Sequence, residues 1–229
     1  GHFYVLNDLG LFQSQAEIDS YVNPTTGKKI QPYAQPGDIK FEDRNGDGVI
    51  GADDRFNAGN SFPKLNYSLN FNAEYKGFDF SMHWVGSEGN KICNGLTLGE
   101  KLMVGTDYNN GTEILNRWRS GHTDTNIPRV SVKDKNNNAS YSTLYIEDGS
   151  FLRLKYVTVG YTFDNKLFNS KISKLRLYLT CQNLLTFTKY TGFDPEVGSD
   201  GSFGNNIYGI DRGIYPQAKS FVLGLNLDF

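Results

Sequence analysis

The chain has 229 residues, 38% of them hydrophobic, which is enough for a packed core in one or two domains. Its 23 basic and 25 acidic residues leave a formal net charge of −2, so the composition gives no electrostatic footprint for binding nucleic acid. Two cysteines, Cys93 and Cys181, cannot build a disulfide framework, and the absence of a run of about 18 apolar residues excludes a membrane-spanning helix.

The first expected strand lies near residues 2–8, and the long connection after it, residues 9–64, contains a calcium-type loop. This loop, "DRNGDGVIGADD", covers residues 43–54 and spaces its oxygen-bearing residues as a hard cation requires, with Gly48 at the sixth position, where the chain must turn sharply. The candidate calcium ligands are Asp43, Asn45, Asp47, the Val49 carbonyl and Asp54.

The twelfth position of this loop departs from the pattern of a calcium sensor. Asp54 stands where sensor loops carry Glu, its shorter side chain reaches less easily for bidentate coordination, and Asp53 beside it can compete for the role. The loop therefore favours a static brace over a sensor. A second interpretation stays open, because Asn, Asp and Gly also dominate ordinary turns that hold no metal.

The strongest pattern in the chain is an alternation of apolar and polar residues with a period of two. "LNYSLNFNAEYK", residues 65–76, alternates without error, and after Gly77 the pattern resumes in "FDFSMHW", residues 78–84, which predicts two strands joined by a tight hairpin. Further strands are predicted at 151–163, at 174–183 and at 220–229. In the first of these the alternation slips near Lys155 and Tyr156, which indicates a bulge.

The length of these runs distinguishes a membrane barrel from a soluble sandwich. Runs of about 10 to 13 residues can cross a bilayer obliquely, whereas soluble strands usually have about 5 or 6. Long connections at 9–64, 91–150 and 187–218 alternate with short turns at Gly77 and 164–173, the asymmetry of barrels with long outer loops and short periplasmic turns. The prediction is an all-β chain that contributes strands to a large antiparallel transmembrane β-barrel.

Six predicted strands cannot close a barrel with a lumen, since the smallest such barrels have eight, and an open edge in lipid is very costly. The chain also begins "GHFYVLNDLG", without an initiator Met or the layout of a signal peptide. We therefore expect residues 1–229 to be the C-terminal part of a larger barrel, with the remaining strands elsewhere.

Several segments in order along the chain resemble the C-terminal region of SusC-like TonB-dependent outer-membrane transporters. They include "GDIKFEDRNGDGVIGADDR", "GNSFPKLNYSLNFNAEYKGFDFSMHWVGSEGNKI", "LYIEDGSFLRLKYVTVGYTF", "CQNLLTFTKYTGFDPEV" and "GIDRGIYPQAKSFVLGLNLDF". The resemblance implies a large barrel in the outer membrane of a Gram-negative cell, filled by an N-terminal plug that this chain does not contain. It also implies import of oligosaccharides or peptides driven through TonB, with a SusD-like surface lipoprotein as the lid.

No constellation of residues predicts catalysis. Carboxylate pairs are expected by chance in polar loops, and the three histidines are too scattered for a ligand set. The alternative function is a secreted, calcium-braced β-rich module that binds carbohydrate or mediates adhesion, which the long alternating runs disfavour.

Candidate contacts to a solute fall into two sets, and neither identifies a substrate. The polar residues expected to face the lumen can hydrogen-bond a passing solute or merely hydrate the barrel; they are Asn66, Asn70, Asn72, Arg176 and Gln182. The aromatic residues of the last long loop can stack on sugars or pack the loop; they are Tyr190, Phe193, Phe203, Tyr208 and Tyr215. In the middle connection, "TEILNRWRSG" predicts a short helix capped by Thr112, with Trp118 as an anchor.

Overall fold

A computed structural model describes residues 1–97, 110–164, 172–200 and 207–229, and its internal contacts divide the chain into two units. Unit 1 comprises Gly1–Ser61, Lys91–Glu147 and Val197–Gly213, and unit 2 comprises Phe62–Asn90, Asp148–Glu196 and Ile214–Phe229. Within the described ranges, no helix is long and apolar enough to cross a membrane.

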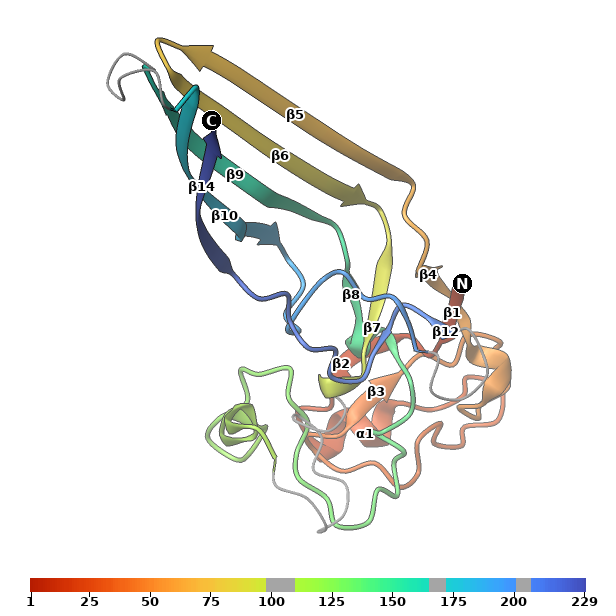
Figure 1. Ribbon diagram of the computed structural model, residues 1–229. Helices are drawn as coiled ribbons and strands as arrows, with labels where there is room; N and C mark the ends of the chain where they lie inside the picture. Colours follow the sequence, from red (N-terminus) through yellow and green to blue (C-terminus); the bar gives the residue numbers. More distant parts are fainter. Residues whose placement is uncertain (98–109, 165–171, 201–206) are drawn as a thin grey trace. The chain divides into compact units, whose positions relative to one another are not determined.

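Unit 2 is built on a five-stranded antiparallel sheet in the order β14-β10-β9-β6-β5 (Figure 1). The strands are β5 (Leu65–Tyr75), β6 (Phe78–Glu88), β9 (Phe151–Phe163), β10 (Lys174–Thr188) and β14 (Ser220–Asp228). They have 11, 11, 13, 15 and 9 residues, so the long strands predicted from the alternation are confirmed. These lengths exceed the usual strand of a soluble protein.

Strands β5 and β6 form the hairpin predicted around Gly77. The two turn residues, Lys76 and Gly77, have φ angles of 47° and 87°, the positive values of a type I′ turn, whose twist matches that of the flanking strands. A Cβ atom at Gly77 would also lie 2.8 Å from the Thr162 carbonyl oxygen. Both the φ angle and the close backbone therefore favour glycine here.

The bulge predicted near Lys155 and Tyr156 is confirmed. Tyr156 pairs with His83 of β6, and Leu154 pairs with the next residue, Trp84, so Lys155 is an extra residue on β9. The register of β9 against β10 shifts at the same place. The bulge returns Leu154 to the face that Val157 also occupies.

The register places the long and short connections at opposite ends of the sheet. Leu65 at the start of β5 pairs with Glu88 at the end of β6, and Phe151 at the start of β9 pairs with Ser87 and with Thr188. The chain therefore enters and leaves the sheet for its long connections at one end. The hairpin turn lies at the other end, where the 164–173 connection, part of which lies outside the described residues, also begins and ends.

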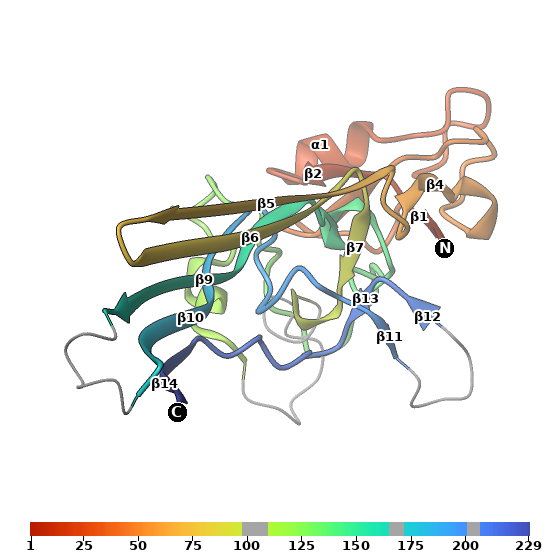
Figure 2. The same cartoon turned by 45° about the horizontal axis from the view of Figure 1, so that its top comes forward.

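The strand expected near residues 2–8 is not part of this sheet, so the prediction of six strands in one sheet is wrong. Instead β1 (His2–Val5) pairs with β4 (Phe56–Asn60) in unit 1 (Figure 2). Four residues are too few to cross a membrane, and Val5 and Leu6 are buried within unit 1. Among the described strands of the large sheet, β5 and β14 are the two edges.

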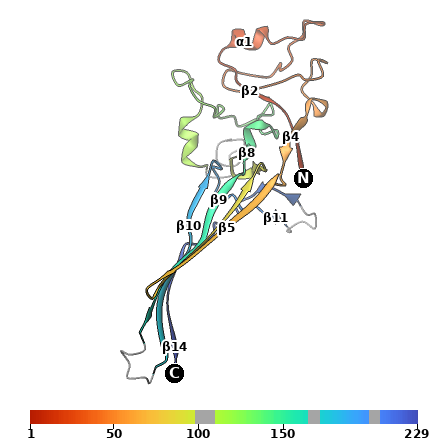
Figure 3. The ribbon, with the colours of Figure 1, turned by 90° about the horizontal axis from the view of Figure 1, so that it is seen from above.

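Unit 1 consists of short elements joined by loops, among them α1 and β2 (Figure 3). Its ladders pair β2 with β3 and β11 with β12, and join β13, β7 and β8 in a three-stranded sheet. The remaining elements are β2 (Asp8–Leu11), α1 (Gln15–Ser20), β3 (Ile39–Phe41), η1 (Ala52–Asp54), β7 (Lys91–Asn94), η2 (Thr112–Asn116), η3 (Thr143–Tyr145), β8 (Ile146–Asp148), which continues into unit 2, β11 (Ser199–Asp200), β12 (Ile207–Tyr208) and β13 (Ile210–Asp211).

Small apolar clusters hold these loops together. One consists of Leu6, Leu11, Ile39 and Phe41, with Trp118 packed against it. The short helix predicted in the middle connection is a 3-10 helix, and its N-cap is Gly111 rather than Thr112, without a side-chain capping bond. Trp118 serves as the predicted anchor: its Nε1 donates to Gln13 Oε1 at 3.0 Å.

Candidate functional site

One face of the unit 2 sheet is an exposed apolar surface. Residues paired directly across antiparallel strands share a face, and on this face Leu69 pairs with Trp84 and Phe71 with Met82. Its most exposed side chains have 39% to 79% of their surface accessible; they are Leu65, Tyr67, Leu69, Phe71, Tyr75, Phe78, Val159, Leu177, Leu179, Leu185, Phe187, Phe221, Leu223 and Leu225. Soluble monomers rarely expose a continuous apolar surface of this kind, whereas the lipid-facing wall of a membrane barrel requires it.

The opposite face is polar and carries an ion pair that crosses a strand. Asp79 of β6 and Arg176 of β10 lie on either side of Gly160 in β9, and Arg176 Nε donates to Asp79 Oδ2 at 2.8 Å. A Cβ atom at Gly160 would overlap Asp79 Oδ2 and approach the Arg176 guanidinium, so any larger residue here would force the pair to shift. The Arg176 guanidinium also lies over the ring of Tyr178, 4.7 Å from its centroid.

The polar residues predicted to face the lumen lie on this face, but two of them already have partners. Arg176 is bound to Asp79, and Asn70 Oδ1 lies 2.6 Å from His83 Nδ1. The register places Asn66, Asn72 and Gln182 on the same face. At least Arg176 and Asn70 therefore bond to neighbouring side chains of the wall, which gives them a structural role apart from any contact with a solute.

A buried charge cluster lies at the end of the sheet where the long connections leave. Arg153, with 3% of its surface exposed, donates to Asp194 Oδ1 at 2.8 Å and is also paired with Glu196. Lys155, at the bulge, reaches Glu196 as well. Burial acts to raise the pKa of Asp194, but the backbone N–H of Gln217, Arg153 and the backbone N–H of Glu196 together hold this pKa below its ordinary value.

The first half of the calcium-type loop is folded as a series of side-chain-to-backbone turns. Asp43 Oδ1 accepts from the Gly46 N–H and Oδ2 from the Gly48 N–H, at 2.9 and 2.8 Å. Asn45 and Asp47 each accept from the N–H two positions ahead, at 2.9 and 2.8 Å. These turns hold alternate oxygen-bearing side chains within one tight loop.

Asp54, the predicted twelfth-position ligand, is buried and has a different set of contacts. Its Oδ1 accepts from the N–H groups of Arg44 and Asn45, and its Oδ2 accepts from the Gly51 N–H at 2.7 Å. Within the described part of the chain, no three His, Cys, Asp or Glu side chains gather in an arrangement that could hold a metal. The three carboxylates of the motif therefore do not converge, although Asp54 Oδ2 keeps one accepting position.

Two residues that the sequence reasoning missed hold this loop against the rest of unit 1. Asn23, with 2% of its surface exposed, donates from Nδ2 to the Gly46 carbonyl at 2.9 Å. Tyr21 Oη donates to the Phe41 carbonyl and accepts from the Asp43 N–H. The dipeptide Asn23–Pro24 marks a turn in the sequence, but it does not reveal that this turn contacts a loop some twenty residues later.

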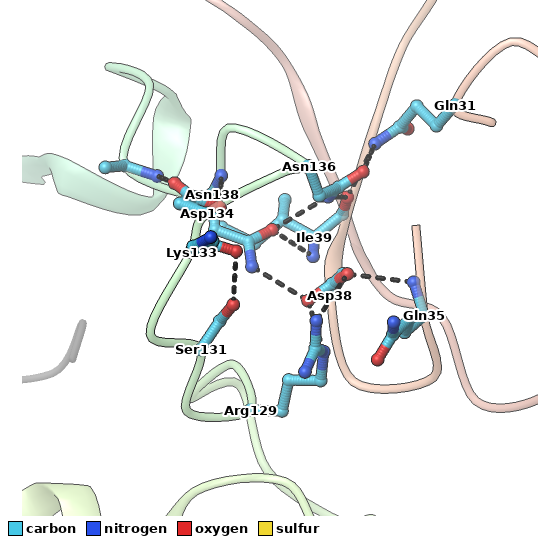
Figure 4. A network of polar contacts seen from close by, with 11 residues as sticks. Gln31, Gln35, Asp38, Ile39, Arg129, Ser131, Lys133, Asp134, Asn136 and Asn138 are labelled. Carbon is cyan, nitrogen blue, oxygen red and sulfur yellow. Dashed lines mark hydrogen bonds and ion pairs between the residues drawn. The ribbon is translucent and has the colours of Figure 1, made fainter. Parts of the chain in front are cut away.

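A second missed feature is the polar network in Figure 4, which joins the first long connection to the second. Asp38 is fully buried and accepts from Arg129 Nε at 2.7 Å and from Asn138 Nδ2 at 2.9 Å. Gln31 Nε2 donates to Asn136 Oδ1 at 2.9 Å. Because buried polar groups are costly unless paired, this network fixes the two loops to each other.

The aromatic residues of the last long loop divide by exposure. Tyr190 is only 6% exposed and therefore packs the loop, whereas Phe193 is 60% exposed and Tyr215 is 86% exposed. Tyr208 is 40% exposed, and Phe203 lies outside the described residues.

Comparisons with known proteins point to one group of receptors. No protein-family model matches the chain. Among curated proteins, the chain is 35% identical over 201 residues to TonB-dependent receptor P3 of Formosa agariphila, covering 86% of the chain and 19% of that receptor. It is 31% identical over 224 residues to TonB-dependent receptor P26 of the same organism, covering 96% of the chain and 22% of the receptor. It is 32% identical over 200 residues to TonB-dependent receptor SusC of Bacteroides thetaiotaomicron, covering 85% of the chain and 18% of that receptor.

Solved structures agree with the sequence comparisons. The structure of the RagAB peptide transporter matches with a TM-score of 0.72 and 25% identity, over 100% of this chain and 22% of that one. The RagAB peptide importer in its open-open state matches in fold with a TM-score of 0.71. The chain spans about a fifth of the length of these curated relatives and solved chains. By sequence and by fold, it belongs to the SusC-like TonB-dependent receptors.

Proposed function

We propose that this chain forms part of the barrel wall of a transporter in the outer membrane of a Gram-negative bacterium. The transporter imports oligosaccharides or peptides, takes energy through TonB, and is capped by a SusD-like surface lipoprotein. The remaining strands and the plug belong to the same transporter. The observation that carries the proposal is the unit 2 sheet, whose long strands expose an apolar face on one side and a polar face on the other.

The edge of this sheet supports the same conclusion. Strand β5, like β14 at the opposite edge, has a partner on one side only among the described strands, and its side chains are exposed along the whole strand. Unpaired backbone groups cost several kcal/mol each in lipid, so a further strand must pair with β5 in a membrane. The secreted-module alternative has no comparable support, because the relatives found are receptors and transporters rather than enzymes or adhesins.

The test combines localisation with uptake. In a bacterium whose full-length receptor contains this chain, the receptor should fractionate with the outer membrane and co-purify with a surface lipoprotein. Its deletion should abolish growth on one member of a panel of oligosaccharides and peptides, and so should loss of TonB. Recovery of the receptor in the medium, or uptake that does not require TonB, would overturn the proposal.

We further propose that the loop at 43–54 binds calcium as a structural brace for the outer loops. Asp43, Asn45, Asp47 and the Val49 carbonyl supply the first ligands, and Asp54 supplies one more through Oδ2. The side-chain turns of the loop support the first part of this set, and the free accepting position of Asp54 allows a single contact rather than a bidentate one.

A further inference from the structure

The loop at 43–54 contains a dipeptide whose covalent chemistry the proposed functions do not use. The chain has three Asn–Gly dipeptides, at Asn45–Gly46, Asn94–Gly95 and Asn110–Gly111. In such a dipeptide the glycine nitrogen can attack the side-chain amide of the asparagine, because glycine has no side chain to hinder the approach. The attack releases ammonia and closes a succinimide ring, which water then opens.

Each of the reacting groups at Asn45 has a hydrogen-bond partner suited to this reaction. The attacking Gly46 N–H donates to Asp43 Oδ1 at 2.9 Å, so a carboxylate is in place to accept the proton that the nitrogen must lose. Asn45 Oδ1, on which negative charge develops, accepts from the Asp47 N–H at 2.9 Å. The departing Asn45 Nδ2 donates to Asp47 Oδ2 at 2.9 Å. A proton acceptor, an oxyanion donor and a contact to the leaving group therefore surround one amide.

The dipeptide at Asn45 is open to water and is held in one place. Asn45 is exposed, and a Cβ atom at Gly46 would meet no other atom within 4 Å. The Gly46 carbonyl accepts from Nδ2 of the buried Asn23 at 2.9 Å, which ties the glycine to the rest of unit 1. Holding reacting groups in a fixed geometry raises the rate of an intramolecular step. The fold therefore supplies both access and positioning.

The Asn94–Gly95 dipeptide lacks these conditions and serves as an internal comparison. Asn94 is 2% exposed, and its Nδ2 donates to Glu147 Oε1 at 2.8 Å. A Cβ atom at Gly95 would lie 2.6 Å from the Asp211 carbonyl oxygen, so other backbone packs directly against this glycine. Close packing resists the movement that ring closure needs, and burial keeps water from the ring. We expect Asn94 to remain unmodified in the folded protein.

We propose that Asn45 is a self-deamidation site, with Asp43 as the proton acceptor and the Asp47 N–H as the oxyanion donor. The Gly46 nitrogen bonds to Asn45 Cγ and passes its proton to Asp43; the Cγ–Nδ2 bond then breaks, and ammonia leaves with this proton. Water opens the ring at Cγ to give aspartate, or at the backbone carbonyl carbon of Asn45 to give isoaspartate. Either product adds a negative charge to the loop, and isoaspartate also lengthens its backbone. The reaction requires neither transport nor a bound ion.

The experiment incubates the purified full-length transporter at neutral pH with EDTA, in water labelled with heavy oxygen. Tryptic digestion in ordinary water and mass spectrometry then follow the peptides 45–55 and 92–101, which contain Asn45 and Asn94. Heavy oxygen enters only residues that are deamidated during the incubation, so products of sample preparation are not counted. Asn45 should gain the label, partly as isoaspartate that an isoaspartyl methyltransferase recognises, and Asn94 should not. A wild-type protein without label at Asn45 would refute the site.

Variants separate assistance by the loop from the ordinary reactivity of an exposed Asn–Gly dipeptide. Asp43→Asn keeps the size of the side chain but removes the proton acceptor, and should slow labelling of Asn45 by about tenfold. Glu113→Gln removes an exposed charge outside the loop and should leave the rate unchanged. A synthetic peptide with the sequence of residues 41–56 gives the rate without the fold, and the wild-type protein should exceed it. An unchanged rate in Asp43→Asn, or a wild-type rate at or below that of the peptide, would refute the assisted reaction.

Discussion

Asp79 and Arg176 are joined over Gly160, so that an ion pair between β6 and β10 crosses the strand between them on the polar face of the sheet. The crossing is possible because Gly160 has no side chain. Side chains, as well as backbone hydrogen bonds, therefore link the strands on the polar face of this sheet. A side chain at position 160 would push these two charged groups apart.

Gly160→Ala in the full-length transporter should destabilise the barrel to about the same extent as Asp79→Asn. The new methyl group would overlap only the ends of the Asp79 and Arg176 side chains, which can move apart, so it should cost little more than the ion pair itself. Loss of this ion pair, whose Arg176 and Asp79 side chains are 21% and 25% exposed on the polar face, costs about 0–1 kcal/mol. Heat-modifiability gels run over a temperature series measure both. A Gly160→Ala barrel that unfolds well below the temperature of the Asp79→Asn barrel would show that the two side chains cannot move apart.

The orientation of the sheet follows from its connections and can be tested by labelling. Cysteine at Lys133, in a long connection, should react with a membrane-impermeant maleimide on intact cells, and cysteine at Ser173, beside the short connection, should react only after the outer membrane is opened. Both side chains are exposed, so access to the reagent decides the result. Labelling of Ser173→Cys on intact cells would reverse the assigned orientation.

Cys93 should be inert in the folded protein. It is 3% exposed, and burial raises the pKa of its thiol to about 11, so very little thiolate exists near neutral pH. A full-length variant without Cys181 and without any cysteine outside residues 1–229 isolates this thiol for reaction with Ellman's reagent. We expect reaction only after denaturation. Rapid reaction of the native protein at neutral pH would mean that the β7 region opens readily.

The sheet was more predictable than the loops, for a physical reason. Alternation is a local signal, so the strand at 65–75, the turn at Gly77 and the bulge at Lys155 could be read from neighbouring residues. The pairing of Asp38 with Arg129 joins residues 91 positions apart, and no local pattern encodes it. For the same reason residues 2–5 were assigned to the wrong sheet, because a short strand does not specify its partner.

The charge cluster around Asp194 predicts a loop that loosens in acid. Since the folded-state pKa of Asp194 is below its ordinary value of 3.8, its ionised form stabilises the folded loop at pH values above about 3.8. This stabilisation should be lost as the pH falls through the lower, folded-state pKa. Hydrogen exchange at the Gln217 N–H, corrected for the intrinsic effect of pH, should report the opening. Asp194→Asn should show weak protection already at neutral pH, and unchanged protection in that variant would exclude the cluster as the cause.

The calcium-type loop gives the last prediction. Asp43→Ala with Asp47→Ala removes two of the proposed negative ligands, and hard-cation affinity depends on ligand charge and number. The purified full-length double variant should therefore bind less calcium than the wild type, measured by elemental analysis after equilibration with a calcium buffer. Its barrel should remain folded, since the strands are held by their own ladder.

The same variant separates a brace from an incidental ion. If calcium orders the outer loops for contact with the lid, the surface lipoprotein should co-purify less well with the double variant. Glu113→Ala, which removes an exposed charge outside the 43–54 loop, should leave both calcium and lipoprotein in place. Loss of calcium with normal lipoprotein association and uptake would rule out the bracing role. A wild-type protein that binds no calcium at millimolar concentration would make the segment an ordinary turn, held by the side-chain bonds of Asp43, Asn45 and Asp47 alone.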